Sequence, residues 1–122
     1  MDAQSLSFPV RLRLKKPLEF KRVFTNPVKS ADRFFTVLAI RNEYSYPRLG
    51  LAITKKNIKK AVTRNFIKRT VRENFRLQQH QLSSIDIVVL ARKDAATATS
   101  ALLKHSLDKH WLKLNYRCES YS

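Results

Sequence analysis

Three stretches of the chain have the spacing of apolar residues that is typical of β-strands. Residues 33–41, RFFTVLAIR, are rich in aromatic and aliphatic side chains. In residues 48–54, RLGLAIT, the large apolar residues occupy alternate positions, which predicts a strand with one apolar face. Residues 85–91, IDIVVLA, are apolar at nearly every position, and this pattern predicts a central strand covered on both sides.

Three other stretches have the features of helices. Pro17 suits the first turn of a short helix, PLEFKRVF, which we expect to stop before Asn26 and Pro27. A second helix is predicted over residues 59–78, and a third over about 97–114. In the third, four apolar residues recur at the spacing of one buried helix face: Leu103, Leu107, Trp111 and Leu114.

These elements follow one another in the order αβββαβα, with one of the three consecutive strands only weakly marked. This order predicts an α+β fold in which helices pack on a small sheet. A chain of 122 residues suffices for one domain with a modest core, and it contains no internal repeat. We therefore expect residues 1–122 to form a single domain, in which the polar and basic residues 1–16 make a partly extended arm.

The charge of the chain indicates the kind of partner it binds. The formal net charge is +16 and the sequence pI is about 10.6, so we expect a polyanion, with nucleic acid ahead of an acidic membrane. The one cysteine, Cys118, cannot form an internal disulfide, which fits a reducing compartment. No apolar run is long enough to span a membrane, and the opening MDAQSLSFPV lacks the features of a signal peptide. We expect a cytoplasmic protein.

The residues required by most enzyme classes are missing or scattered. The one glycine, Gly50, excludes a glycine-rich phosphate loop and a dinucleotide fingerprint. The histidines do not have zinc-binding spacing, and we interpret His105 and His110 as residues on a helix surface rather than as catalysts. The acids occur singly, whereas metal-dependent nucleases present clustered carboxylates. We expect neither a catalytic side chain nor a metal site in the protein.

The strongest charge run lies in and just before the second predicted helix, where nine cations accompany one acid, Glu73. The cations are Lys55, Lys56, Lys59, Lys60, Arg64, Lys68, Arg69, Arg72 and Arg76. Because a helix turns by about 100° per residue, six polar residues fall within an arc of roughly 140°. These residues, here called the basic stripe, are Arg64, Asn65, Lys68, Arg69, Arg72 and Arg76. The residues expected to face the sheet are Thr63, Ile67, Thr70, Val71 and Phe75.

Two interpretations of the basic stripe compete. Most charge runs on helices are solvated faces. Here, however, Arg64, Lys68, Arg72 and Arg76 follow one another at i, i+4, and like charges at that spacing cost roughly 0.2–0.5 kcal/mol per pair. Phosphates along the stripe would remove this cost, and arginine can hold a phosphate with two hydrogen bonds. We therefore interpret the stripe as a polyanion-binding surface.

The run RLGLAITKKNIKKAVTRNFIKRTVREN resembles the signature of the bacterial ribonuclease P protein subunit. That signature has an Arg-Val/Ile-Gly-Leu strand, a Lys-Lys pair, and an Arg-Asn-Arg-x-x-Lys-Arg helix with a further Arg and Glu. The matching residues are Lys55, Lys56, Arg64, Asn65, Lys68, Arg69, Arg72 and Glu73. The similarity continues through RLRLKKPLEFKRVF and DIVVLARK, so it covers nearly the whole chain. Phe66 departs from the Arg-Asn-Arg triplet, and we expect one RNA contact to be lost or moved there.

The resemblance implies a function and a topology. In this family the large partner RNA is the catalyst, and it uses bound magnesium ions to remove the 5′ leader of precursor tRNA. The protein subunit, monomeric by itself, binds that RNA and the leader, with magnesium held mainly by RNA. The fold implied is an α/β sandwich whose basic helix connects two parallel, adjacent strands by a left-handed crossover, although general rules favour the opposite hand.

The resemblance also implies a leader-binding cleft between the first helix and the sheet. The matching residues are Phe20 and Phe24 on the helix and Phe35 on the first strand. Unpaired bases stack on aromatic rings whatever their sequence, which suits a protein that accepts many leaders. From the sequence alone, core packing is the favoured role of these phenylalanines, whereas the resemblance implies a partly open cleft lined by at least two of the three. Four cations are candidates for the rim: Lys15, Lys16, Lys21 and Arg22.

Three other functions are compatible with parts of this pattern. A ribosomal or RNA-chaperone protein would also bind structured RNA without a role in cleavage. A reader of duplex DNA could place the basic helix in the major groove, but strands rather than a helix-turn-helix flank this helix. A nuclease that acts without RNA is disfavoured by the scattered acids.

Overall fold

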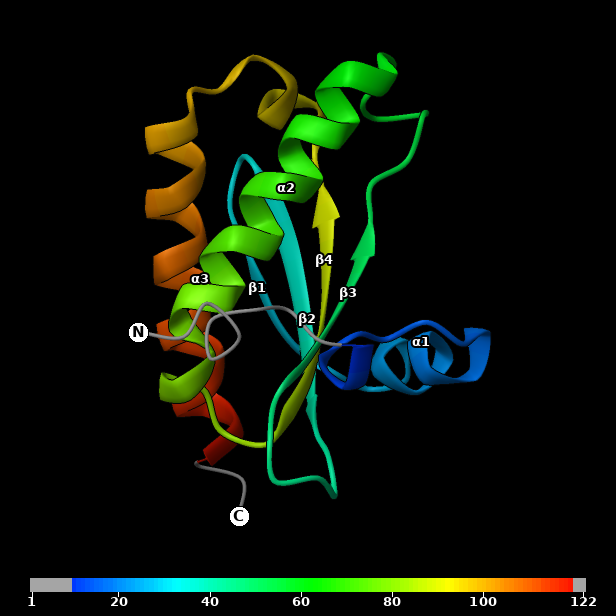
Figure 1. The fold of residues 1–122 in the computed structure, drawn as a ribbon, viewed down its shortest axis with the longest axis vertical. Coiled ribbons are helices and arrows are strands. Elements are labelled where there is room, and N and C mark those ends of the chain that lie inside the picture. Colours follow the sequence, from blue (N-terminus) through cyan, green and yellow to red (C-terminus); the bar gives the residue numbers. More distant parts are fainter. Residues whose placement is uncertain (1–9, 120–122) are drawn as a thin grey trace.

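In the computed structural model, which describes residues 10–119, the chain forms a four-stranded mixed sheet with three α-helices (Figure 1). The helices are α1 (Pro17–Phe24), α2 (Ala61–Gln78) and α3 (Ser100–Glu119). The strands are β1 (Val28–Ala31), β2 (Phe35–Arg41), β3 (Arg48–Ala52) and β4 (Ile85–Ala91). The 3₁₀ helices are Val10–Leu12, Gln79–Gln81 and Lys93–Thr97. The predicted α+β class and the order αβββαβα are confirmed.

The boundaries of two helices differ from the predicted ones. The first helix and the last strand cover the predicted residues, but α2 begins only at Ala61 because the backbone of Lys60 is extended. Helix α3 begins at Ser100, after the separate 3₁₀ helix Lys93–Thr97, and continues to Glu119. Its buried face contains all four predicted residues and extends by one more turn to Cys118.

Strand β4 lies at the centre of the sheet, as its continuous apolar sequence predicts. The strand order is β1-β2-β4-β3, in which β4 pairs antiparallel with β2 and parallel with β3. Every side chain of β4 is buried except that of Leu90, which is half-buried. Burial on both faces therefore explains why this strand has no polar alternation.

The connection from β3 through α2 to β4 has the left-handed sense that the resemblance implies. In Figure 1 both arrows point upward, α2 passes in front of the sheet and crosses the upper part of β2, and β4 ends to the left of β3. Parallel strands are joined with the opposite hand in about 98% of cases. The hand matters here because it places α2 on the same side of the sheet as α3.

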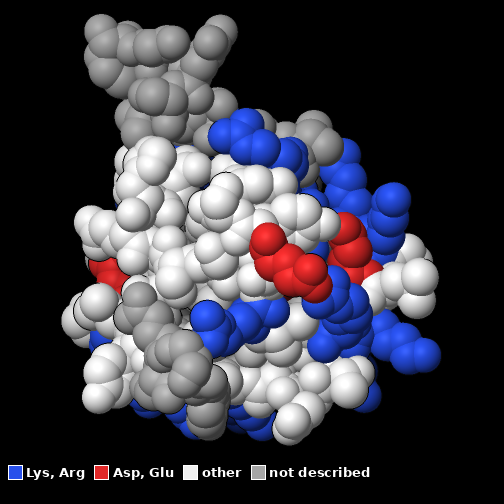
Figure 2. All heavy atoms as spheres, turned by 90° about the horizontal axis from the view of Figure 1, so that it is seen from below, with Lys and Arg blue, Asp and Glu red and all other residues white. Residues whose placement is uncertain are grey.

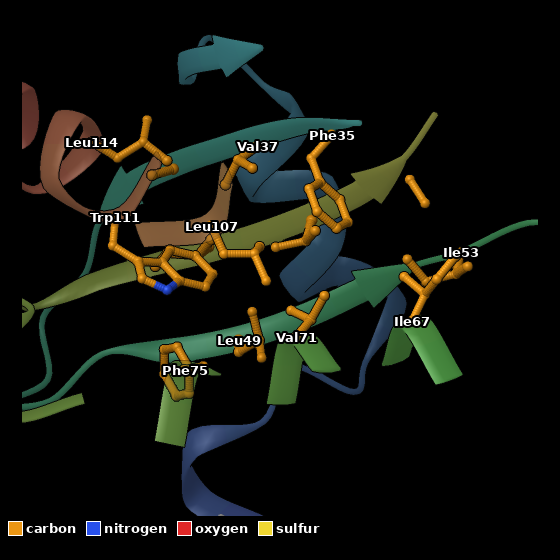
Figure 3. Close-up of a cluster of buried hydrophobic side chains, with 14 of the residues drawn as sticks. Phe35, Val37, Leu49, Ile53, Ile67, Val71, Phe75, Leu107, Trp111 and Leu114 are labelled. Atoms are coloured by element: carbon orange, nitrogen blue, oxygen red, sulfur yellow. The ribbon is translucent and has the colours of Figure 1, made fainter. Parts of the chain in front are cut away.

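The side of the sheet covered by α2 and α3, here called the core face, carries the main hydrophobic core. Figure 3 shows side chains from both helices meeting those from β2 and β3. Phe75 of α2 and Trp111 of α3 pack edge to face, with ring centroids 6.1 Å apart. The indole N–H of Trp111 donates to the side-chain oxygen of buried Asn74. This hydrogen bond satisfies both polar groups inside the interface between the two helices.

The opposite side, here called the α1 face, has a much smaller core. Its buried apolar side chains are Leu14, Val23, Leu38 and Val88. The ring of Phe20 lies directly over Gly50, where a Cβ atom would stand only 2.7 Å from the ring. The single glycine of the chain therefore lets α1 approach β3 closely.

The backbone conformation after α1 and the contacts before it explain the position of this helix. Helix α1 stops at Phe24 because Asn26 adopts a left-handed backbone conformation (φ 54°) and Pro27 follows. Before the helix, the backbone N–H of Leu14 donates to the carbonyl of Leu49 over 2.9 Å, so residues 13–14 lie along the edge of β3. Of the arm expected over residues 1–16, residues 1–9 lie outside the described residues.

Candidate nucleic-acid interface

Helix α2 presents one apolar and one cationic side. Its buried residues are Ile67, Thr70, Val71, Asn74 and Phe75, and predicted Thr63 is half-buried. On the outer side Asn65, Arg69 and Arg72 are exposed and Lys68 is half-buried. The four lysines before the helix, Lys55, Lys56, Lys59 and Lys60, are all exposed. The loop and the outer side of the helix therefore both present cations to solvent.

Three members of the basic stripe form no ion pair with any described residue. Within residues 10–119, no ion pair or hydrogen bond holds the side chains of Lys68, Arg69 and Arg72. By contrast, buried Arg48 lies 2.7 Å from Asp86, and exposed Arg33 lies 3.5 Å from Asp94. The unpaired cations of α2 are thus available to an external anion.

Two stripe residues make contacts inside the protein. Arg64 is half-buried, and its Nη1 donates to the carbonyls of Ile58 and Lys59 over 3.0 and 2.9 Å. It therefore fixes the loop that leads into α2. Arg76 forms an ion pair with Glu73. The spacing of Glu73 and Arg76 is that of neighbours on one helix face, whereas the helical wheel cannot show that Arg64 turns back on its own loop.

One further cation joins the stripe from a distant part of the sequence. Arg13 lines a shallow hollow of about 350 Å³ together with residues of α2, which are Asn65, Arg69, Arg72, Glu73 and Arg76. The bridge between Arg13 and Leu49 along β3 places it there. The sequence contains a signal for this arrangement, because RLRL alternates cations with Leu12 and Leu14, which are buried.

The structure brings Phe20 and Phe24 together on α1 but places Phe35 elsewhere. Successive side chains of a strand point to opposite faces, and Phe35 lies on the core face with Val37, fully buried (Figure 3). Phe20, in contrast, is half-buried on the α1 face, and Phe24 is 47% exposed. Phe35 is therefore a core residue, and the expectation that it lines an open cleft with Phe20 is wrong.

Other residues take the place of Phe35 on the α1 face. Alternation along β2 puts Thr36 and Ile40 on this side, and the sheet register places Leu90 beside Thr36 and Ala52 beside Leu90. All four are half-buried, as is Phe20. We call these five residues the open surface: Phe20, Thr36, Ile40, Ala52 and Leu90. A short helix covers this face only in part, which leaves a mixed aromatic and aliphatic surface accessible.

Cations lie close to the open surface. The four residues suggested for the rim, Lys15, Lys16, Lys21 and Arg22, are all exposed on or next to α1. On the face shown in Figure 2, lysine and arginine atoms gather towards the right, where Figure 1 places α1. Aromatic and aliphatic side chains beside cations have the chemistry needed to bind a single-stranded nucleic acid.

Comparisons with known proteins agree with this geometry. A family model described as Ribonuclease P matches residues 8–115. The ribonuclease P protein components of Methylococcus capsulatus and Idiomarina loihiensis are 51% and 44% identical, over 100% and 97% of this chain and 95% of each relative. The Staphylococcus aureus RNase P protein superposes with a TM-score of 0.77 at 38% identity, covering 84% of this chain and 93% of that one. The RNase P protein from Thermotoga maritima superposes with a TM-score of 0.73 at 30% sequence identity. The match covers 81% of this chain and 94% of that one.

The chain belongs to the ribonuclease P protein family. It is the protein subunit of ribonuclease P, an RNA-binding component of an endoribonuclease that processes tRNA. The predicted assignment to this family and to this enzyme is confirmed.

Phe66 is the position at which this ribonuclease P protein departs from the expected Arg-Asn-Arg triplet. Its side chain is 41% exposed, on the outer side of α2, and Val62 one turn earlier is 74% exposed. The backbone carbonyl of Phe66 accepts a hydrogen bond from the Thr70 hydroxyl over 2.9 Å, within the helix. An apolar ring thus borders the stripe where the family signature has a cation.

The histidines of this family member do not all lie at the surface. His105 is exposed, but His110 is buried between α3 and β1, so its interpretation as a surface residue is wrong. Its Nδ1 lies 2.7 Å from the hydroxyl of buried Ser30, and its Nε2 lies 3.2 Å from a carboxylate oxygen of Asp32. Burial lowers the pKa of His110, which favours the neutral ring. Ser30, Asp32 and His110 also line a surface hollow of about 470 Å³ beside α3.

The pKa of Asp32, beside His110, is lowered. Burial by itself would raise it, but hydrogen bonds from Ser106 and from the backbone N–H groups of Phe35 and Phe34 outweigh the effect of burial.

Among residues 10–119, no three His, Cys, Asp or Glu side chains are grouped so that they could hold a metal ion. No helix within the same range is long and apolar enough to cross a membrane.

Proposed function

We propose that the basic stripe binds the catalytic RNA of ribonuclease P and that the open surface binds the 5′ leader of precursor tRNA. In this arrangement the RNA hydrolyses the phosphodiester with magnesium ions held by RNA and substrate. The protein increases affinity for the precursor and favours productive binding of those ions. It joins the complex as a monomer in the cytoplasm, where its one cysteine remains reduced.

The observation that carries this proposal is the lack of acidic partners for Lys68, Arg69 and Arg72 on the outer side of α2. Like charges so close together repel one another, and each i, i+4 pair costs a few tenths of a kcal/mol. RNA phosphates along the helix would turn this repulsion into attraction and release condensed counterions. Asn65, neutral and exposed among these cations, can donate or accept a hydrogen bond without adding charge.

The open surface supports the second half of the proposal. A protein that acts on many tRNA precursors has to accept leaders of different sequence. Stacking on Phe20 or Phe24 fits that need, because every base has an aromatic face and stacking is worth about 1–3 kcal/mol per base. The aliphatic side chains of Ala52 and Leu90 extend the same surface across β3 and β4.

Magnesium is assigned to the RNA because the described residues do not form a carboxylate cluster that fits this ion. The protein side chains then bind and position substrate but take no part in bond cleavage. No catalytic role is therefore proposed for the acids or histidines of the chain.

The decisive experiment is reconstitution with ribonuclease P RNA and a precursor tRNA at low magnesium concentration. The protein should increase cleavage by the RNA, and the protein freed of RNA should not cleave. Cleavage that survives complete removal of RNA, and that is lost when a protein acid or histidine is mutated, would contradict the proposal. Binding to ribosomal RNA in preference to ribonuclease P RNA would also contradict it.

A further inference from the structure

A buried arginine connects helix α1 to the sheet. Arg48, the first residue of β3, is 7% exposed in its side chain. Its Nε and Nη2 donate to the two carboxylate oxygens of Asp86 in β4 over 2.9 and 2.7 Å, and its Nη1 donates to Glu19 of α1 over 3.0 Å. The three residues, here called the Arg48 bridge, thus tie two neighbouring strands to the first turn of α1.

Surrounding groups hold each member of the Arg48 bridge in one orientation. Asp86 Oδ1 also accepts a hydrogen bond from Asn42 over 2.8 Å, and the ring of Tyr44 lies 4.4 Å from the guanidinium carbon. Only arginine has the planar fork that can serve two carboxylates in this way. Lysine, a point donor on a flexible stem, would lose this geometry.

Glu19 has two functions at once. Its Oε2 faces Arg48, while its Oε1 accepts hydrogen bonds from the backbone N–H groups of Lys15 and Lys16 over 2.9 and 3.0 Å. The hydrogen bond from the Lys16 backbone N–H, with further contributions from Lys15 and Arg48, lowers the pKa of Glu19. The carboxylate therefore stays ionised at neutral pH, where it joins the start of α1 to β3.

The position of α1 depends on few other contacts. Eight residues are too few for a helix that is stable by itself in water. On the α1 face, the buried apolar cluster of the described residues is small, with Leu14, Val23, Leu38 and Val88, and Phe20 packs against it. Buried ion pairs contribute little net stability, but they can favour one geometry over others because any other arrangement leaves a buried charge unpaired.

The Arg48 bridge and the open surface are adjacent. Arg48 and Gly50 lie on the same side of β3, two residues apart. Glu19 contacts the first of them, and Phe20, the next residue of α1, lies over the second. A change in the Glu19 contact would therefore move the Phe20 ring relative to the sheet.

We infer that Arg48, through Glu19, is a positioning residue for leader binding, which holds α1 so that Phe20 presents its ring to the leader. This inference rests on the leader contact proposed above. Arg48 touches no substrate in this arrangement, and its effect reaches the leader only through the position of α1.

The sharpest test is Glu19→Gln in the reconstituted holoenzyme. The amide can keep its oxygen towards Lys15 and Lys16, but it then turns its NH₂ group towards Arg48, so that a donor faces a donor. If the amide flips, it regains Arg48 and loses the two backbone contacts. This variant leaves the Arg48–Asp86 pair intact, whereas Arg48→Ala would leave Asp86 buried and unpaired and could fail to fold.

The measurement compares dissociation constants for a precursor tRNA with a leader of several nucleotides and for the mature tRNA. Glu19→Gln should weaken precursor binding by about three- to tenfold, a part of the value of one base–aromatic stack, and leave mature tRNA binding unchanged. Glu43→Gln removes the same charge from an exposed position and is the matched control, with no change expected. Thermal unfolding and the affinity for ribonuclease P RNA should remain close to wild type in both variants.

Two results would overturn the inference. Equal weakening for precursor and mature tRNA would show that the Arg48 bridge acts only on general folding. Unchanged precursor binding by Glu19→Gln would show that the position of α1 does not depend on the contact between Glu19 and Arg48. Phe20→Ala, tested alongside, then identifies which proposal has failed. If Phe20→Ala still weakens precursor binding selectively, the leader proposal stands and only the positioning role is wrong; if it does not, both are wrong.

Discussion

On its core face the sheet is covered by two helices of 18 and 20 residues, and on its α1 face by one helix of eight. The core face buries Phe35, Phe75 and Trp111 almost completely, whereas Phe20 and Leu90 on the other face remain half-buried. Both faces are built from the same strands with the same side-chain alternation. The number of covering helices therefore decides which apolar residues stabilise the fold and which remain available to a ligand.

The difference has a physical reason. A chain of 122 residues gains much of its stability from a well-packed core. Once α2 and α3 complete that core, the other face can stay partly uncovered at a modest cost in solvation. Apolar surface left in this way is typical of binding sites.

The largest effect is expected for a matched pair of phenylalanines, beginning with Phe35→Ala. This change leaves a cavity in the core and should lower the free energy of unfolding by about 3–5 kcal/mol. Chemical denaturation of the purified protein measures it. In the folded fraction, the ratio of precursor to mature tRNA affinity should remain that of the wild type. A stable Phe35→Ala protein that has lost leader binding would reverse the assignment of the two faces.

Phe20→Ala should give the opposite result. Precursor tRNA binding is expected to weaken by about 1–3 kcal/mol, the value of one base stack, while mature tRNA binding is retained. The loss of unfolding free energy should be smaller than for Phe35→Ala, because Phe20 is only half-buried. Leu18→Ala, which removes an apolar side chain that is 73% exposed on the same helix, is the control and should change neither property.

Arg72 lies on neither face of the sheet, and so it separates affinity for RNA from both fold stability and leader binding. Arg72→Ala should reduce the slope of log affinity against log salt concentration by about one unit in titrations with ribonuclease P RNA. Lys104→Ala removes one positive charge from an exposed position on α3 and should leave the slope nearly unchanged. Equal slopes for wild type and Arg72→Ala would identify the stripe as a solvated surface.

The smallest expected effect is the pH dependence of stability that arises from His110, which lies between α3 and β1 at the edge of the core face. Its pKa is lowered in the folded protein, so the unfolded chain binds the proton more readily. Stability should therefore fall as the pH falls through about 6.5, the ordinary pKa of histidine. Denaturation of wild type and His110→Gln between about pH 5 and pH 8 tests this. The wild type should lose more stability towards low pH; parallel curves would contradict the prediction.

The sequence determined the elements whose signals are local. The continuous apolar run of β4 predicted a central strand, and Pro17 together with Asn26-Pro27 bounded α1 at the observed residues. The clustering of cations before and within α2 predicted a polyanion-binding surface, because net charge and helical spacing follow directly from residue order. The family signature added the function and the unusual hand of the crossover.

Contacts between residues far apart in the chain could not be predicted from residue order and are known from the tertiary structure alone. The strand pattern showed that Phe35 and Thr36 face opposite ways, but not which face α1 would cover, so Phe35 was expected beside Phe20 although it lies on the other face. Arg13 joined the stripe, and His110 became buried, through packing against β3 and β1. The Arg48 bridge joins positions 19, 48 and 86, which no local pattern connects. Residue spacing fixes local geometry, whereas burial and ion pairing depend on which distant surfaces meet when the chain folds.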